Sequence, residues 1–147
     1  METTPRPAKT QITILVVDDD PLVRQLVFSV LQHGDEYNVL LASSGAEALR
    51  QSKDFRNEIQ VLISDFQMSE MSGIELATAM TVDRPKLKVL MMSGFPEGML
   101  VLNEGWHFLP KPFVSSQLRT LIVGLVAPDK KSRFAGSVVA AQRGPQE

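Results

Sequence analysis

Acidic and basic side chains follow three short apolar runs that lie far apart in the chain. Asp18 and Asp19 follow the first run, Asp65 follows the second, and Lys111 follows the third. The carboxyl ends of the strands of a parallel α/β sheet open on one edge, and ligands bind at that edge. If the three runs are strands of such a sheet, we expect the three carboxylates and the lysine to converge there. Carboxylates that face one lysine suit a divalent cation and a phosphoryl group in transfer.

The composition of the chain fits one folded domain and excludes several kinds of protein. The chain has 147 residues, of which 44% are hydrophobic, and it has no cysteine. This length suits a single domain, and the hydrophobic content is too high for a disordered chain. The lack of cysteine excludes disulfides and thiolate metal sites, and it fits the cytoplasmic location that we expect. The formal net charge of -2 gives no global sign of a nucleic-acid-binding protein.

Two further absences bear on location. Residues 1–11 are polar and lack the apolar core of a signal peptide. No apolar run approaches the ~20 residues that a membrane span requires. We therefore expect no insertion into a membrane.

Short apolar runs alternate with segments of helical periodicity. The expected strands are 12–17, 38–42, 60–64, 87–92 and 106–109. Helical patterns cover 21–33, 44–56, 72–82 and 114–126, and the connection 94–105 has room only for a short helix. Continuous apolarity of the strands indicates that both faces of the sheet are covered. The alternation predicts an α/β fold with a doubly wound, five-stranded parallel sheet in the order 2-1-3-4-5, a flavodoxin-like (βα)5 arrangement with a short fourth helix.

Local signals place the starts of two helices and the limits of the domain. Asp20 has the character of an N-cap, with Pro21 as the first helical residue. Ser44 and Glu47 have the spacing of a capping box. We expect a flexible N-terminal segment over residues 1–10 and a folded domain over residues 11–127. A mostly disordered tail should follow over residues 128–147.

Four motifs give the chain a family resemblance. They are the acidic pair Asp18-Asp19 after the first strand, Asp65 after the third, Ser93 at the end of the fourth, and Lys111-Pro112 after the fifth. Each motif alone is weak, but all four stand on the appropriate strands in the appropriate order. Over residues 11–127 the chain resembles the CheY-like receiver domains of two-component response regulators, of the stand-alone or hybrid-kinase type. The resemblance implies a phosphorylation-dependent signalling switch.

The resemblance also implies an acceptor and a metal site. Asp65 accepts a phosphoryl group from a histidine kinase or a phosphotransfer protein. Mg²⁺ is held by Asp18, Asp19 and Asp65, together with the backbone carbonyl of Gln67, and Asp19 is the more direct ligand of the acidic pair. Three carboxylates in one pocket repel each other unless a cation or protons intervene. Apart from its own Mg²⁺-dependent phosphorylation and dephosphorylation, the chain is not expected to be an enzyme.

Three further residues receive roles by the same resemblance. Lys111 pairs with Asp65 before transfer and with the phosphoryl oxygens afterwards, and the Lys111-Pro112 bond is often cis in this family. Ser93 donates its hydroxyl to a phosphoryl oxygen, and Phe108 then swings inward as an aromatic switch. Output should pass through protein contacts with an unknown target, and not through direct contact with nucleic acid.

The chain departs from the family pattern at several points. Ser69 stands where proline is usual, which should loosen the loop after Asp65. Val114 stands where a capping threonine is common, which weakens the start of the last helix. The span from Ser93 to Lys111 is short, as in receiver domains attached to hybrid histidine kinases. A dimer linked to phosphorylation remains open, although this shortening alters the usual dimer face.

Two alternatives to a switch remain open from the residues alone. A haloacid-dehalogenase-type phosphatase would use Asp18 as nucleophile and Asp20 as acid/base, but Leu22 and the lack of a later acidic pair count against it. A receiver-like scaffold would bind partners without phosphorylation. Taken singly, Asp65 could be a loop-capping aspartate and Phe108 a plain core aromatic.

Overall fold

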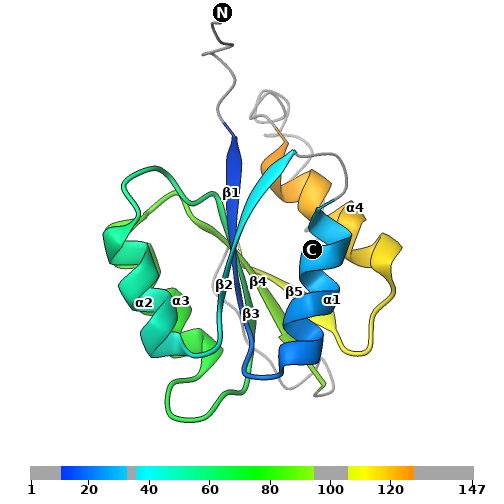
Figure 1. Cartoon of the computed structure of the whole chain (residues 1–147), viewed down its shortest axis with the longest axis horizontal. Helices are drawn as coiled ribbons and strands as arrows, with labels where there is room; N and C mark the ends of the chain where they lie inside the picture. The colour runs from blue at the N-terminus through cyan, green and yellow to red at the C-terminus, as the bar shows by residue number, and fades with distance from the viewer. Residues whose placement is uncertain (1–10, 33–35, 95–105, 128–147) are drawn as a thin grey trace, which may run out of the picture.

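Five strands form one parallel sheet in the computed structural model, which describes residues 11–32, 36–94 and 106–127 (Figure 1). The strands are β1 (Ile12–Val17), β2 (Tyr37–Ala42), β3 (Val61–Asp65), β4 (Lys88–Ser93) and β5 (Trp106–Pro110). Their order is β2-β1-β3-β4-β5, and every neighbouring pair is parallel. The predicted strand order is therefore confirmed. Each strand differs from its predicted bounds by at most one residue at either end.

Two helices cover each face of the sheet. The helices are α1 (Pro21–Leu31), α2 (Gly45–Asp54), α3 (Gly73–Asp83) and α4 (Ser115–Val126). Figure 1 shows α1 and α4 together on one face and α2 and α3 together on the other. The short helix predicted for 94–105 falls on residues 95–105, which are outside the described part of the chain. The predicted flexible segments 1–10 and 128–147 are also outside it.

Alternate side chains of each strand enter two separate cores. Ile14 and Ile63 pack with the side chains of α1 and α4, whereas Leu15 and Leu62 pack with those of α2 and α3. All four are fully buried. Burial of each such side chain stabilises the fold by about 1.5–3 kcal/mol relative to exposure. Coverage of both faces explains why the strands are continuously apolar, as the sequence indicates.

The predicted helix starts are largely present. The Asp20 carboxylate accepts a hydrogen bond from the Leu22 N–H at 2.9 Å and caps α1. The Ser44 hydroxyl accepts from the Glu47 N–H at 3.1 Å and caps α2. The Glu47 carboxylate, however, accepts from the backbone N–H of Ser43 at 2.7 Å and not from that of Ser44. The capping box predicted at α2 therefore closes one residue further out.

The last helix begins without a capping side chain, as expected at Val114. The backbone N–H of Val114 instead donates to the side-chain oxygen of Gln117 at 2.9 Å. This bond satisfies one backbone donor at the helix start, which partly offsets the missing threonine.

Leu26 stays exposed at the border of the buried face of α1. Val27, Val30 and Leu31 are buried and Val23 is half-buried, but Leu26 is 44% exposed. Leu26 lies at the edge of the apolar stripe, beyond the surface that the sheet and α4 cover. The helix therefore presents a large apolar side chain to solvent, close to the carboxyl ends of the strands.

Gly73 allows α3 to begin directly against the end of β3. Its backbone N–H donates to the Phe66 carbonyl at 2.9 Å. A Cβ atom added at Gly73 would lie 2.3 Å from the Asp65 carbonyl oxygen and 3.1 Å from the Ser64 hydroxyl oxygen. Because the nearest of these atoms belongs to the backbone, it cannot move aside without displacing the strand end.

We predict that Gly73→Ala lowers the free energy of unfolding by about 2–4 kcal/mol, because it overpacks a site with no space. Gly124→Ala is the matched control, because a Cβ there meets nothing within 4 Å and the position is exposed within α4. Alanine should stabilise that helix by about 0.5–1 kcal/mol. Urea unfolding of the two variants measures both effects. Equal stabilities would contradict the close approach at Gly73.

Candidate functional site

The register of the sheet brings the acidic residues and the lysine to one edge. Val17 is level with Ser64, so Asp18 and Asp65 follow at the same height on neighbouring strands. Ser93 is level with Pro110, and the Lys111 N–H donates to the Ser93 carbonyl at 2.7 Å. Lys111 therefore directly follows the end of β5 and lies beside the end of β4.

The charged groups meet as the sequence predicts. One carboxylate oxygen each of Asp18, Asp19 and Asp65 lies within 4.8 Å of the others. The Lys111 ammonium lies 2.9 Å from Asp65 Oδ1 and 3.2 Å from Asp18 Oδ2, and it donates a hydrogen bond to each. The Lys111-Pro112 peptide bond is cis. Two of the three carboxylates, those of Asp18 and Asp65, thus share the Lys111 ammonium.

Burial and neighbouring charges perturb the two central groups. Asp65 is 9% exposed, and its burial, together with the Asp18 charge, raises the pKa of its carboxyl in spite of the hydrogen bond from Lys111. Burial alone would lower the pKa of Lys111, but its hydrogen bonds to Asp65 and Asp18 and their charges outweigh this effect and raise it. Lys111 is therefore firmly protonated. The negative charge of Asp65, in contrast, is only partly compensated by its neighbours.

Asp18 is fixed more tightly than Asp19. It is 1% exposed, and its Oδ1 atom accepts from the Asp20 N–H at 2.8 Å while Oδ2 faces Lys111. Asp19 is exposed. A cation that enters from solvent can therefore contact the Asp19 carboxylate directly. Contact with Asp18 would require it to displace one of the hydrogen bonds that hold that side chain. This difference supports the prediction that Asp19 is the more direct ligand.

The site fits a hard divalent cation. Its donors are carboxylate oxygens, which Mg²⁺ and Ca²⁺ prefer, and the mutual repulsion of Asp18 and Asp65 is one cause of the raised pKa of Asp65. Gln67 lies two residues beyond Asp65 with an exposed side chain. The role of its backbone carbonyl as a ligand stays a prediction.

The loop after Asp65 is held at both ends. The Phe66 N–H donates to the Met92 carbonyl at 2.8 Å on β4, and the Phe66 carbonyl accepts from Gly73. Within the loop, the Met71 N–H donates to the Ser69 carbonyl at 2.8 Å, and Glu70 has a φ of 71°. The chain turns sharply at Glu70, in the left-handed region that most residues avoid. Ser69 thus takes part in a defined turn although it replaces a proline.

Ser93 and Phe108 lie on β4 and β5, next to the charged groups. Ser93 is 3% exposed at the end of β4. Phe108 is half-buried and packs against the core on the α2 and α3 side. It is level with Met91, two residues before Ser93. The described contacts are therefore those of a core aromatic near the edge of the sheet, and its role as a switch stays a prediction.

Arg24 contributes to the site but is missing from the residues expected there. Its guanidinium donates to the Asp18 carbonyl oxygen at 2.7 Å. The contact ties the first turn of α1 to the end of β1 and so holds Asp18 in place. Its position in the first turn of the helix that follows the acidic run was the available signal, but an arginine there is more often solvated.

The phosphatase alternative finds no support at this edge. It requires the Asp18 and Asp20 carboxylates to act on one substrate. The Asp20 carboxylate is instead engaged with the Leu22 N–H as the cap of α1.

Within residues 11–32, 36–94 and 106–127, no helix has the length and apolarity to cross a membrane.

Comparisons with known proteins agree with the geometry of the site. A family model described as the response regulator receiver domain matches residues 14–123. Sensor kinase CckA of Brucella abortus (strain 2308) is 34% identical over 114 residues, which is 75% of this chain and 12% of that protein. Transcriptional regulatory protein LnrK of Bacillus subtilis (strain 168) is 33% identical over 98 residues, or 64% of this chain and 44% of that protein. The chain thus spans less than half the length of these relatives.

Solved structures are similar over most of the described chain. The Vibrio cholerae chemotaxis protein CheY4 has a TM-score of 0.68 and 29% identity, and the match covers 80% of this chain and 100% of that one. The receiver domain of the hybrid histidine kinase CckA has the same TM-score and identity, over 78% of this chain and 98% of that one.

We predict that Asp65→Asn stabilises the protein at neutral pH in the absence of Mg²⁺. The raised pKa of Asp65 means that ionisation of this carboxyl costs more in the folded than in the unfolded state. The protonated Asp65 carboxyl contributes fully to the stability of the fold below its ordinary pKa of 3.8. This contribution is lost as pH rises through the higher pKa of the folded state. The stability difference between variant and wild type should therefore grow over that range. Thermal unfolding between pH 3.5 and 7.5 measures it.

Mg²⁺ should reverse the order of stability, because an ion that binds the folded wild type stabilises it by mass action. Glu58→Gln serves as a control, since Glu58 is an exposed carboxylate at the opposite edge of the sheet. Its stability relative to wild type should not respond to Mg²⁺ in this way. An Asp65→Asn variant that is less stable than wild type at pH 7 without Mg²⁺ would contradict the balance of charges described here.

Proposed function

Because the chain belongs to the response regulator receiver domains, which are phosphorylation-dependent signalling switches, we propose that Asp65 is its phosphoryl acceptor. The observation that carries the proposal is the position of the Lys111 ammonium, 2.9 Å from Asp65 and 3.2 Å from Asp18 at the carboxyl edge of the sheet. A capping aspartate needs no such cation. A phosphoryl acceptor does, because it adds negative charge to a site that already holds three carboxylates.

The hydrogen bonds of Asp65 indicate how transfer proceeds. Lys111 engages Oδ1, so Oδ2 is the atom that attacks phosphorus. With a phosphohistidine donor, the new O–P bond forms as the P–N bond breaks, and the imidazole nitrogen keeps the electron pair and takes up a proton. Lys111 then neutralises charge on the phosphoryl oxygens. A lysine suits this task because its ammonium is a mobile point charge.

Mg²⁺ is the proposed cofactor, held by Asp18, Asp19, Asp65 and the backbone carbonyl of Gln67. When bound, it supplies positive charge that neutralises the carboxylates and the phosphoryl oxygens. The chain itself contributes the fixed orientation of Asp18, through Arg24 and the Asp20 N–H. Support for the cofactor comes from the three carboxylate oxygens within 4.8 Å of one another.

Ser93 and Phe108 are proposed to convey the phosphorylated state to the surface. Ser93 ends the strand next to β3, so its hydroxyl is suitably placed to donate to a phosphoryl oxygen. Phe108 borders a cavity of about 420 Å³ between β5 and α4. A movement of Phe108 changes the shape of that edge, which is the proposed contact surface for a protein target.

An apolar patch beside the site is proposed to receive the phosphoryl donor. This patch, the α1 patch, consists of Leu22, Leu26, Pro112 and Phe113. Leu22 is 77% exposed, and Leu26 lines a cavity of about 390 Å³ with Lys111, Pro112 and Phe113. Exposed apolar groups rimmed by charges are typical of protein contact sites. A histidine kinase or phosphotransfer protein docked there, in the cytoplasm, would reach Asp65 past Lys111.

We predict that acetyl phosphate with Mg²⁺ adds one phosphoryl group to the chain. Intact mass spectrometry should detect the adduct in wild type and not in Asp65→Asn. Asp20→Asn is the matched control, because the amide keeps the cap of α1 and Asp20 lies outside the proposed acceptor set. An adduct that survives in Asp65→Asn would remove Asp65 as acceptor. Continuous release of phosphate that depends on Asp20 would instead restore the phosphatase alternative.

We predict that Leu26→Glu slows phosphorylation by a phosphohistidine protein by about tenfold or more, because it places a charge in the α1 patch. Phosphorylation by acetyl phosphate should be unchanged, since this small donor needs no docking surface. Val82→Glu is the control, as Val82 is 76% exposed on α3, away from the patch. Time courses with a phosphotransfer protein that phosphorylates the wild type measure the rates. An equal loss with both donors would indicate damage to the site itself.

A further inference from the structure

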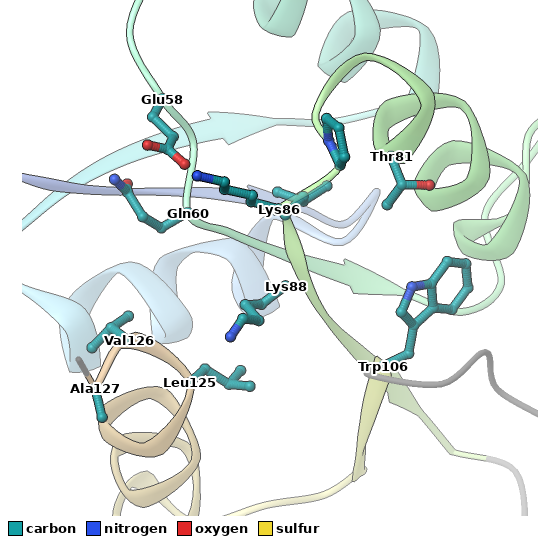
Figure 2. A pocket seen from close by; sticks show the side chains of 11 residues that line it. Glu58, Gln60, Thr81, Lys86, Lys88, Trp106, Leu125, Val126 and Ala127 are labelled. Atoms are coloured by element: carbon teal, nitrogen blue, oxygen red, sulfur yellow. The ribbon is translucent and has the colours of Figure 1, made fainter. Parts of the chain in front are cut away.

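A large cavity lies at the edge of the sheet opposite to Asp65. Its volume is about 760 Å³, and it is lined by residues at the amino ends of β4 and β5, by the chain just before β3, and by the end of α4 (Figure 2). The size is within the range of small-molecule sites. None of the residues that line it takes part in the proposed phosphorylation chemistry.

Two lysines line this cavity without a partner charge. Lys86 and Lys88 are both exposed, and no ion pair engages either ammonium within the described part of the chain. The lining contains one carboxylate, Glu58, which no ion pair of the described residues joins to either lysine. In Figure 2 both lysine side chains extend away from Trp106, that of Lys86 towards Glu58 and Gln60 and that of Lys88 towards the end of α4. With two lysines and one carboxylate, the lining carries an excess of positive charge.

Gln60 and Trp106 add neutral hydrogen-bond donors. The Gln60 side-chain oxygen accepts from the Thr13 N–H at 2.7 Å, which fixes the amide and leaves its NH2 group as a donor. Trp106 is half-buried on the opposite side of the cavity, and its indole nitrogen faces the lysines in Figure 2. Among the described residues, this N–H has no hydrogen-bond acceptor. An indole N–H usually finds an acceptor when it is buried.

The remaining wall is apolar. Leu87, Leu125 and Val126 line the cavity together with the ring of Trp106. A ligand that fills it must therefore carry an anionic group at the lysine side and a less polar body against the leucines. The lining offers four donor groups and one acidic acceptor, so a phosphate monoester, with two charges and three terminal oxygens, uses it more fully than a single carboxylate does.

We propose that this cavity is a binding site for a small organic phosphate of the mononucleotide type. The phosphate is held by Lys86, Lys88 and the Gln60 amide, and the ring of the base accepts a hydrogen bond from Trp106.

The position of Trp106 makes the site directly testable, because it is the only tryptophan of the chain. Adenosine 5′-monophosphate, added to the full-length protein, should change the tryptophan fluorescence in a saturable manner, and calorimetry should give the same affinity. Ribose 5-phosphate and adenosine, each lacking one half of the ligand, should bind at least about tenfold more weakly. No saturation by the mononucleotide up to ~10 mM would overturn the proposal. Equal binding of inorganic phosphate would mean an adventitious ion only, and would overturn it too.

Variants identify the residues that bind. The double change of Lys86→Ala and Lys88→Ala should weaken binding by about tenfold or more, and Trp106→Phe should weaken it several-fold in calorimetry. Lys53→Ala is the matched control, because Lys53 is an exposed lysine on α2 outside the lining. Phosphorylation of Asp65 by acetyl phosphate should proceed in all variants, which shows that they fold. Binding that is insensitive to Lys86 and Lys88 but lost in the Lys53 variant would refute the assignment.

Discussion

The ion pairs of Lys111 are the interaction on which the functional edge depends. One ammonium, carried on the chain just after β5, engages carboxylates that follow β1 and end β3. It therefore joins three elements that are distant in sequence, at a place where burial makes an uncompensated charge costly. The compensation is incomplete, because burial and the charge of Asp18 still raise the pKa of Asp65. A site in this condition is prepared for further positive charge, which is the property that a phosphoryl acceptor needs.

Much of this arrangement follows from the sequence by simple physics. Continuous apolar runs and helical patterns gave the sheet order, because a sheet covered on both faces leaves only a few connections open. The convergence of Asp18, Asp65 and Lys111 then followed from the strand ends alone. Asp20 was also predictable as a cap, since Pro21 marks the first helical residue.

Other features depend on tertiary contacts that no local pattern encodes. Leu26 fits the apolar stripe of α1 by periodicity, yet only the extent of the covering elements decides that it is exposed. Arg24 reaches a backbone carbonyl, an acceptor that every residue carries and that leaves no mark in the sequence. The two lysines of the cavity, which have no ion pair among the described residues, are likewise evident only from the three-dimensional arrangement.

The close approach of Gly73 to Asp65 also limits which side of the sheet can move when the surroundings of Asp65 change. With the first turn of α3 in direct contact with the backbone of Asp65, that side of the sheet has no clearance in which to move. A rearrangement that starts at Asp65 meets a fixed stop towards α3. We therefore expect it to pass the other way, through β4 into β5, beyond which the sheet of the described residues has no further strand.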